Sequence, residues 1–250
     1  MIEHLANSTA WWAAAGGGAA LTAAGTLAHG LFRPSSQMFG KVIWKGDRSA
    51  TEALALTFDD GPHPDGTTAI LDQLAECDVR ATFFVIGAHA QRWPDLVRRM
   101  TDEGHLVANH SYDHKLTGLI YMGPYWRDQI RRTNDVVEQL TGHRPNLFRP
   151  PMGFKHWQLL QVAQAEGMRT VNWSRRARDG VSTTSQKILD RLVEPSVAGD
   201  IILLHDGIVE RLPRSTEPTI EALGQLIKGL KQRGLAITRL DDLICEQIGA

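Results

Sequence analysis

Short apolar runs alternate with longer amphipathic stretches along most of the chain after residue 36. Apolar runs bounded by turn residues predict buried strands, and apolar positions that recur every three or four residues predict helices. The predicted strands cover residues 53–58, 81–86, 106–108, 147–148, 169–171, 200–204 and 236–238. The predicted helices cover residues 67–76, 94–103, 124–140, 156–166, 185–194 and 218–233. This alternation predicts an α/β fold with a parallel sheet, open or closed into a barrel.

Reactive side chains follow five of the predicted strands at the point where each strand ends. They are Asp59 with Asp60, Asn109 with His110, Arg149, the segment 174–179, and His205 with Asp206. Ligands of parallel α/β folds bind at the carboxyl ends of the strands. The five clusters therefore predict a single functional site at one end of the sheet.

The first 36 residues differ from the rest, so we expect an N-terminal segment at 1–36 and a catalytic domain at 37–250. Residues 10–32 contain no Asp, Glu, Lys or Arg. This predicts an apolar helix that anchors in a membrane or lies on it. The stretch contains five glycines, which weaken such a helix. The alternative is therefore a soluble or poorly ordered N-terminal helix on a cytoplasmic protein. Lys and Arg residues follow the segment and none precedes it, so the positive-inside rule would keep the catalytic domain in the cytoplasm.

The bulk composition narrows the class of protein. Hydrophobic residues make up 42% of the chain and charged residues 22%, which is ordinary for a globular protein with a sizeable core. A formal net charge of -1 provides no field that attracts nucleic acid. Cys77 and Cys245 are the two cysteines, and their separation predicts neither a disulfide framework nor a thiolate metal site.

The carboxylates and histidines at the strand ends suit a metal centre. Neighbouring strand residues point in different directions, so one of Asp59 and Asp60 is free to bind metal while the other faces substrate. His110 and His114 stand at i and i+4, which places them on one face of a helical turn. Two histidines, one carboxylate and an open position for water form a recurring catalytic zinc arrangement. Co²⁺ and Ni²⁺ also fit such a donor set.

This donor set predicts a hydrolytic reaction. A bound metal lowers the pKa of its water towards about 7. A nearby carboxylate then takes the proton as the water attacks a carbonyl carbon. The departing amine needs a proton in turn, and His205 is the residue type suited to supply it.

These motifs resemble those of the polysaccharide deacetylase family, carbohydrate esterase family 4, with its NodB homology domain. Residues 57–64, TFDDGPHP, resemble the first motif in full, and residues 110–114, HSYDH, resemble the second. Residues 149–153, RPPMG, and residues 203–207, LLHDG, are similar to the third and fifth motifs. The resemblance covers about residues 52 to 240 and implies a distorted (β/α) barrel with seven strands.

The resemblance also implies a role for each matching residue. The implied metal ligands are Asp60, His110 and His114. The implied catalytic base is Asp59, which Arg149 orients, and the implied catalytic acid is His205. The backbone N–H of Met152 helps to form the implied oxyanion hole. Asp179 is also an implied catalytic residue, placed to pair with Arg149 or with His205.

Two motifs depart from the family pattern. The third motif usually has a tyrosine where Met152 stands. The fourth motif usually reads D-x-x-D-W, but residues 176–180 read RARDG. The loss of two aromatic side chains predicts a wider pocket. The arginines at 175, 176 and 178 suit a phosphate or carboxylate on the substrate, with a solvated basic loop as the alternative.

The sequence therefore predicts a metal-dependent hydrolase that removes an N-acyl group, first of all acetyl, from an amino sugar. The arginines and the apolar N-terminal segment add the hypothesis of a glycan linked to a lipid phosphate. Two alternatives stay open. One is a deformylase or another C–N amide hydrolase of the same fold. The other is a catalytically silent glycan-binding protein, which would have no use for both an acid and a base.

Overall fold

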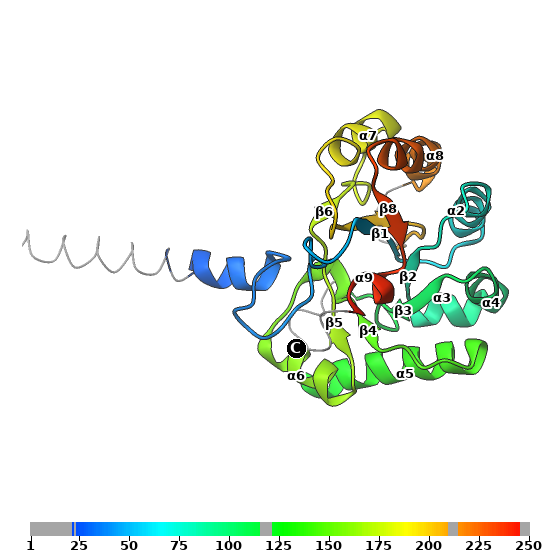
Figure 1. Ribbon diagram of the computed structural model, residues 1–250. Coiled ribbons are helices and arrows are strands. Elements are labelled where there is room, and N and C mark those ends of the chain that lie inside the picture. Colours follow the sequence, from blue (N-terminus) through cyan, green and yellow to red (C-terminus); the bar gives the residue numbers. More distant parts are fainter. Residues whose placement is uncertain (1–21, 23, 116–121, 210–214, 246–250) are drawn as a thin grey trace, which may run out of the picture.

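A parallel β-sheet forms the centre of the structure, a computed structural model that describes residues 22, 24–115, 122–209 and 215–245 (Figure 1). Its hydrogen-bonded order is β5-β4-β3-β2-β1-β7-β6, with β8 paired to β1. The strands are β1 (Ala53–Asp59), β2 (Thr82–Val85), β3 (Leu106–Asn109), β4 (Leu147–Phe148), β5 (Arg169–Thr170), β6 (Arg175–Arg176), β7 (Ile201–His205) and β8 (Ala236–Thr238).

Helices lie around the outside of this sheet (Figure 1). They are α2 (Pro64–Glu76), α3 (Gly87–Arg92), α4 (Pro94–Asp102), α5 (Gly123–Thr141), α6 (Trp157–Ala165), α7 (Ser185–Leu192), α8 (Glu217–Gln232) and α9 (Leu240–Leu243), with a short 3₁₀ turn, η2 (Pro151–Gly153). Several begin at a proline that suits the first helical turn, as α2, α4 and α5 do. The longer helices α2 and α8 each bury an apolar face in the core, with Ile70, Leu71 and Leu74 on α2 and Leu223, Leu226 and Ile227 on α8.

The alternation of side chains along the strands separates two apolar clusters. On β1, Leu54, Leu56 and Phe58 join the cluster between the sheet and the outer helices, whereas Ala55 joins a second cluster on the other face. Because the side-chain period of a strand is two, Thr57 and Asp59 point to the same face as Ala55. The pattern of β1 therefore directs Asp59 towards the inner face of the sheet.

The sheet curls instead of lying flat. Its end strands, β5 and β6, are joined to it only on one side in the part of the chain that the structure describes. Residues 43–45 lie between these ends, with a parallel bridge from Ile43 to Val171 and an antiparallel bridge from Lys45 to Asp200. The predicted parallel α/β architecture is confirmed as a curled parallel sheet.

The sequence pattern predicted most elements to within a few residues and missed three. The helices α3 and α9 are too short to show a clear period. Strand β6 consists of two arginines and was expected to be a loop. It is held by backbone pairing of Arg175 and Arg176 with β7, which an apolar pattern does not report.

The structure describes only the last part of the predicted N-terminal helix at residues 10–32. Residues 24–32 are helical and mostly exposed, while residues 10–21 and 23 lie outside the described part. No helix of the described part is long and apolar enough to cross a membrane. The helix ends against the domain, where Lys155 donates from its backbone N–H to the Leu31 carbonyl and from Nζ to the Arg33 carbonyl. Membrane association of residues 10–32 stays a prediction. Both cysteines are free, as expected.

Candidate active site

The predicted metal ligands meet at the carboxyl ends of β1 and β3. Asp60 Oδ1 lies 3.2 Å from His110 Nε2 and 3.3 Å from His114 Nε2. All three residues are at least 96% buried, and one ligand atom of each lies within 4.8 Å of the others. The structure thus brings together three donors that the sequence separates by up to 54 positions, the distance from 60 to 114.

The orientation and protonation of the histidines suit a cation. His110 Nδ1 lies 2.8 Å from the Arg149 carbonyl oxygen. A carbonyl only accepts, so Nδ1 carries the hydrogen and Nε2 keeps its lone pair towards Asp60. Burial lowers the pKa of His110 and lowers the pKa of His114 to about 3, so both rings are neutral at pH 7. Two neutral imidazoles and one carboxylate fit a divalent metal such as zinc.

The segment that joins the two histidines is not the helical turn that the i, i+4 spacing predicted. Residues 110–114 form an irregular loop with no helix. Ser111 has φ 68° and His114 has φ 46°, both in the left-handed region. The prediction was wrong because contacts from outside the segment, which spacing does not reveal, determine its conformation.

Asp59 is held by a buried arginine. Arg149 is fully buried, and its Nη1 donates to Asp59 Oδ1 at 2.7 Å and to the Thr57 hydroxyl at 2.8 Å. Its Nη2 donates to the Asn172 carbonyl at 3.1 Å. The other oxygen, Asp59 Oδ2, lies 3.7 Å from His110 Nε2. One carboxylate oxygen is therefore fixed by Arg149 while the other faces the metal-ligand cluster.

Asp179 pairs with His205 and not with Arg149, which decides between the two partners that the sequence left open. Asp179 Oδ1 lies 2.8 Å from His205 Nδ1, and Asp179 Oδ2 accepts from the His205 backbone N–H and the Thr219 hydroxyl, each at 2.8 Å. Burial opposes a charge on His205, but the nearby carboxylates, Asp179 first among them and then Asp59 and Asp206, together raise the pKa of His205 above 6.5. The same partners hold the pKa of Asp179 below its usual value despite its burial.

His205 lies next to the metal-ligand cluster. The register pairs Asp59 on β1 with His205 on β7, so both side chains leave the same face of the sheet. His205 Nε2 lies 4.0 Å from Asp60 Oδ2, and the side chain is 17% exposed. The arrangement therefore has a carboxylate and a partly exposed imidazole next to the three donors, 3.7 Å and 4.0 Å from their nearest ligand atoms.

The remaining predicted residues surround this centre. Met152 lies three residues after Arg149 on the same loop, with φ 56° and its side chain 44% exposed. Arg175 forms an ion pair with Asp200 at 3.0 Å, so it has a structural partner. Arg176 and Arg178 are exposed, and Arg178 directly precedes the buried Asp179.

One contact of the centre involves a histidine outside the sequence motifs. His89 Nδ1, on α3, lies 2.9 Å from the backbone oxygen of Asp60. Asp60 itself has φ 73°, a conformation that needs support for a residue other than glycine. His89 has no motif partner at a recognisable spacing, so only the packing of α3 against the end of β1 reveals it.

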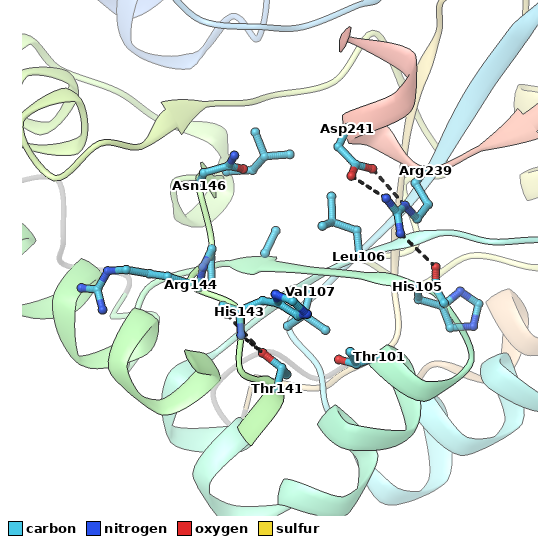
Figure 2. A pocket seen from close by; sticks show the side chains of 14 residues that line it. Thr101, His105, Leu106, Val107, Thr141, His143, Arg144, Asn146, Arg239 and Asp241 are labelled. Atoms are coloured by element: carbon cyan, nitrogen blue, oxygen red, sulfur yellow. Dashed lines mark hydrogen bonds and ion pairs between the residues drawn. The ribbon is translucent and has the colours of Figure 1, made fainter. Parts of the chain in front are cut away.

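A cavity of about 470 Å³ lies at the opposite end of the sheet (Figure 2). It is lined by the start of β3 at Leu106, by Asn146 before β4, and by Arg239 with Asp241. Arg239 already forms two hydrogen bonds to Asp241, at 3.0 and 2.7 Å. None of the predicted site residues lines this cavity, so its size does not compete with the metal-ligand cluster as the candidate active site.

Comparison with known proteins agrees with the geometry. The polysaccharide deacetylase family model matches residues 46–171. A peptidoglycan-N-acetylglucosamine deacetylase of Bacillus cereus is 32% identical over 86% of this chain and 98% of its own length. A chitooligosaccharide deacetylase of Bradyrhizobium is 34% identical over 79% of this chain and 93% of its own length. A crystal structure of a peptidoglycan N-acetylglucosamine deacetylase in complex with a hydroxamate-type benzamide is similar with a TM-score of 0.75 at 30% identity, covering 82% of this chain and 92% of that one.

Proposed function

The chain belongs to the polysaccharide deacetylase family, and from that premise we propose that it hydrolyses the N-acetyl group of an amino sugar. The observation that supports this most is that Asp59 and His205 both lie next to the donor set, with Asp59 3.7 Å from His110 and His205 4.0 Å from Asp60. Amide hydrolysis needs a base for the attacking water and an acid for the departing amine, and this site supplies both.

The three donors would hold the metal ion. A divalent ion in this cluster would lower the pKa of a water molecule and polarise the acyl carbonyl. Asp60, His110 and His114 are all buried, so these residues would hold the ion away from bulk solvent. Zinc is the proposed ion, and cobalt or nickel would also suit these ligands.

Asp59 acts as the general base in this proposal. Its Oδ2 takes a proton from the attacking water while its Oδ1 stays bonded to Arg149. The bond from Arg149 fixes the orientation of the Asp59 carboxylate and so the direction of its free oxygen. General base catalysis of this kind contributes about 10²- to 10⁴-fold to the rate.

His205 acts as the general acid. Its Nδ1 stays bonded to Asp179, so the proton that it gives to the departing amine nitrogen leaves from Nε2. The raised pKa of His205 keeps this proton in place until the C–N bond breaks. One proton enters at Asp59 and one leaves from His205 in each turnover, so the two residues re-equilibrate through solvent before the next. The backbone N–H of Met152 is the proposed donor to the developing oxyanion.

The finer proposal concerns the substrate: an amino sugar linked to a lipid phosphate. Arg176 and Arg178 are exposed in the segment that leads to the buried Asp179. Each would form a charge-assisted hydrogen bond with a phosphate, worth about 1.5–3 kcal/mol. The charge-free stretch at residues 10–32 would bring the site to a membrane surface that carries such a substrate.

A substrate panel tests both levels of the proposal. Neutral N-acetyl oligosaccharides and polyprenyl-phosphate-linked sugars are compared, with acetate and formate both measured. Acetate release that is lost on chelation supports deacetylation, whereas formate without acetate would identify a deformylase. No release from any member while glycans still bind would favour a silent binding protein.

Variants of the two arginines test the anionic substrate. Arg176→Ala and Arg178→Ala should each raise KM for the phosphate-bearing substrate about tenfold or more, because about 1.4 kcal/mol corresponds to tenfold. KM for a neutral oligosaccharide should stay unchanged. Arg98→Ala is the matched control, since Arg98 is exposed on α4 and paired with Asp95. Equal effects on both substrates would contradict a phosphate contact.

A further inference from the structure

The loop between the two histidine ligands has a conformation that it would not adopt by itself. Ser111 and His114 both have left-handed backbone angles. Residues with a Cβ rarely adopt this conformation, and they keep it only where surrounding contacts enforce it. The source of those contacts therefore decides where the imidazoles of His110 and His114 point.

Gln129 supplies the contacts at the middle of the loop. This residue of α5 is 2% exposed, and its Oε1 accepts the backbone N–H groups of Tyr112 and Asp113, each at 3.0 Å. These two N–H groups lie between His110 and His114 in the chain. The two lone pairs of a single side-chain carbonyl thus hold both central peptides of the loop.

Other residues on the same helix also contact the loop, and the backbone N–H groups of Gly87 and Ala88 on α3 donate to the Ser111 and Tyr112 carbonyls. Tyr125 donates from its hydroxyl to Asp113 Oδ1 at 2.8 Å, and the Arg132 guanidinium lies 3.6 Å from the centre of the Tyr112 ring. Positions 125, 129 and 132 are spaced i, i+4 and i+7, which places them on one face of α5. The face of α5 towards the loop is therefore polar.

The start of the loop is fixed from the same helix. Asn109 Nδ2 donates to Asn134 Oδ1 at 2.7 Å and to the Ile130 carbonyl at 2.9 Å. Its Oδ1 then accepts the Ser111 backbone N–H at 2.8 Å, next to the left-handed residue. Side-chain amides of α5 therefore hold the loop at Ser111 through Asn109 and at Tyr112 and Asp113 directly.

The geometry points to Gln129 as a positioning residue of the metal centre, one that sets the affinity for a divalent cation without touching it. By holding Tyr112 and Asp113, Gln129 keeps His110 Nε2 and His114 Nε2 at 3.2 and 3.3 Å from Asp60 Oδ1. This inference rests on the proposed metal centre and extends it to a residue outside the family motifs. Partners that orient metal ligands commonly change metal affinity about 10- to 100-fold when they are lost.

Zinc affinity of the metal-stripped protein, measured by competition with a chelator, tests the inference without any substrate. Gln129→Met keeps the side-chain length and removes the acceptor, so it should weaken zinc binding about 10- to 100-fold. Gln129→Glu keeps an acceptor oxygen and should retain most of the affinity. Val137→Ala is the control, because Val137 is buried on α5 two turns further on and belongs to the apolar core. It should lower stability and leave zinc affinity unchanged.

Backbone hydrogen exchange of the metal-free protein provides a second readout. The Tyr112 and Asp113 amides should exchange faster in Gln129→Met than in the wild type, and the Glu variant should restore their protection. Should Gln129→Met fail to fold, Gln129→Asn takes its place, since it withdraws the amide by one methylene group and should show the same two effects. Unchanged zinc affinity and unchanged exchange in these variants would overturn the role of Gln129. A wild-type protein that does not bind zinc would overturn the proposed metal centre and this inference with it.

Discussion

Replacement of Asp179 by Asn tests the assignment of His205 as the acid. The change removes the charge next to His205 and keeps the size of the side chain. In the wild type, burial lowers the pKa of His205, and the carboxylates of Asp179, Asp59 and Asp206 together raise it by more, with Asp179 contributing most among them. In Asp179→Asn the strongest of these opposing charges is lost, so the pKa of His205 should fall. A larger fraction of the acid would then be deprotonated at pH 7 before the C–N bond breaks.

The same pair stabilises the fold over a defined pH window. The pKa of Asp179 is lowered, so its contribution is present above pH 3.8 and is lost as the pH falls through the folded value. The pKa of His205 is raised, so its contribution to the free energy of unfolding is complete below pH 6.5. That contribution is lost as the pH rises through the pKa of His205 in the folded protein. The free energy of unfolding should therefore differ most between wild type and variant from pH 3.8 to 6.5. Loss of one partner of a buried pair costs about 3–5 kcal/mol. We expect the lower end, because Asn still accepts from Thr219.

Two assays check the prediction. The pH dependence of acetate release should show the basic limb of kcat shifted to lower pH in Asp179→Asn, with kcat at pH 7 reduced about 10²-fold, the lower end for general acid–base catalysis. Urea unfolding at several pH values should show the stability window. Thr219→Val is the control, since it removes one hydrogen bond and keeps the charge, at a cost of about 1 kcal/mol. An unshifted basic limb in Asp179→Asn would refute the assignment of His205 as the acid.

Three further outcomes follow from the geometry. Chelation should abolish acetate release, and added zinc should restore it in the wild type. Zinc should not restore activity in Asp60→Asn, which lacks a metal ligand. Full activity of the metal-free wild type would contradict a metal centre. Gly207→Ala should weaken zinc binding at least tenfold and lower Tm, because the added Cβ would overlap the Asp60 carbonyl oxygen. Gly224→Ala is the control, because its added Cβ would have room, and it should change neither zinc affinity nor Tm. Equal zinc affinity in the Gly207 and Gly224 variants would contradict a role of the close approach at Gly207. Wild-type stability should rise from pH 8 towards 10.5, because burial lowers the pKa of Lys155 to about 8, and Lys155→Met should remove that rise in urea unfolding.

The sequence predicted the strands around the site because their patterns are local. Along β1, Leu54, Leu56 and Phe58 alternate with smaller or polar residues, and such alternation reports which face of a strand is buried. The sequence pattern did not predict strand β6, because this strand is made of two arginines and pairs through its backbone. The conformation of the loop at residues 110–114 was not predicted for a related reason. The i, i+4 spacing of its histidines is typical of a helix, but Gln129 on α5 holds the loop in another conformation.

The residue types at the strand ends, by themselves, determined the chemistry of this protein. Asp59, Asp60, His110, His114 and His205 are the groups that a metal-assisted hydrolysis needs, and parallel strands bring their carboxyl ends to one edge. Only the tertiary structure decided how these groups are used, because each is oriented by a partner far away in the chain. Asp179 pairs with His205 across 26 positions, and Arg149 reaches Asp59 across 90. Such pairings depend on the register of neighbouring strands and on buried hydrogen bonds, which leave no period in the sequence.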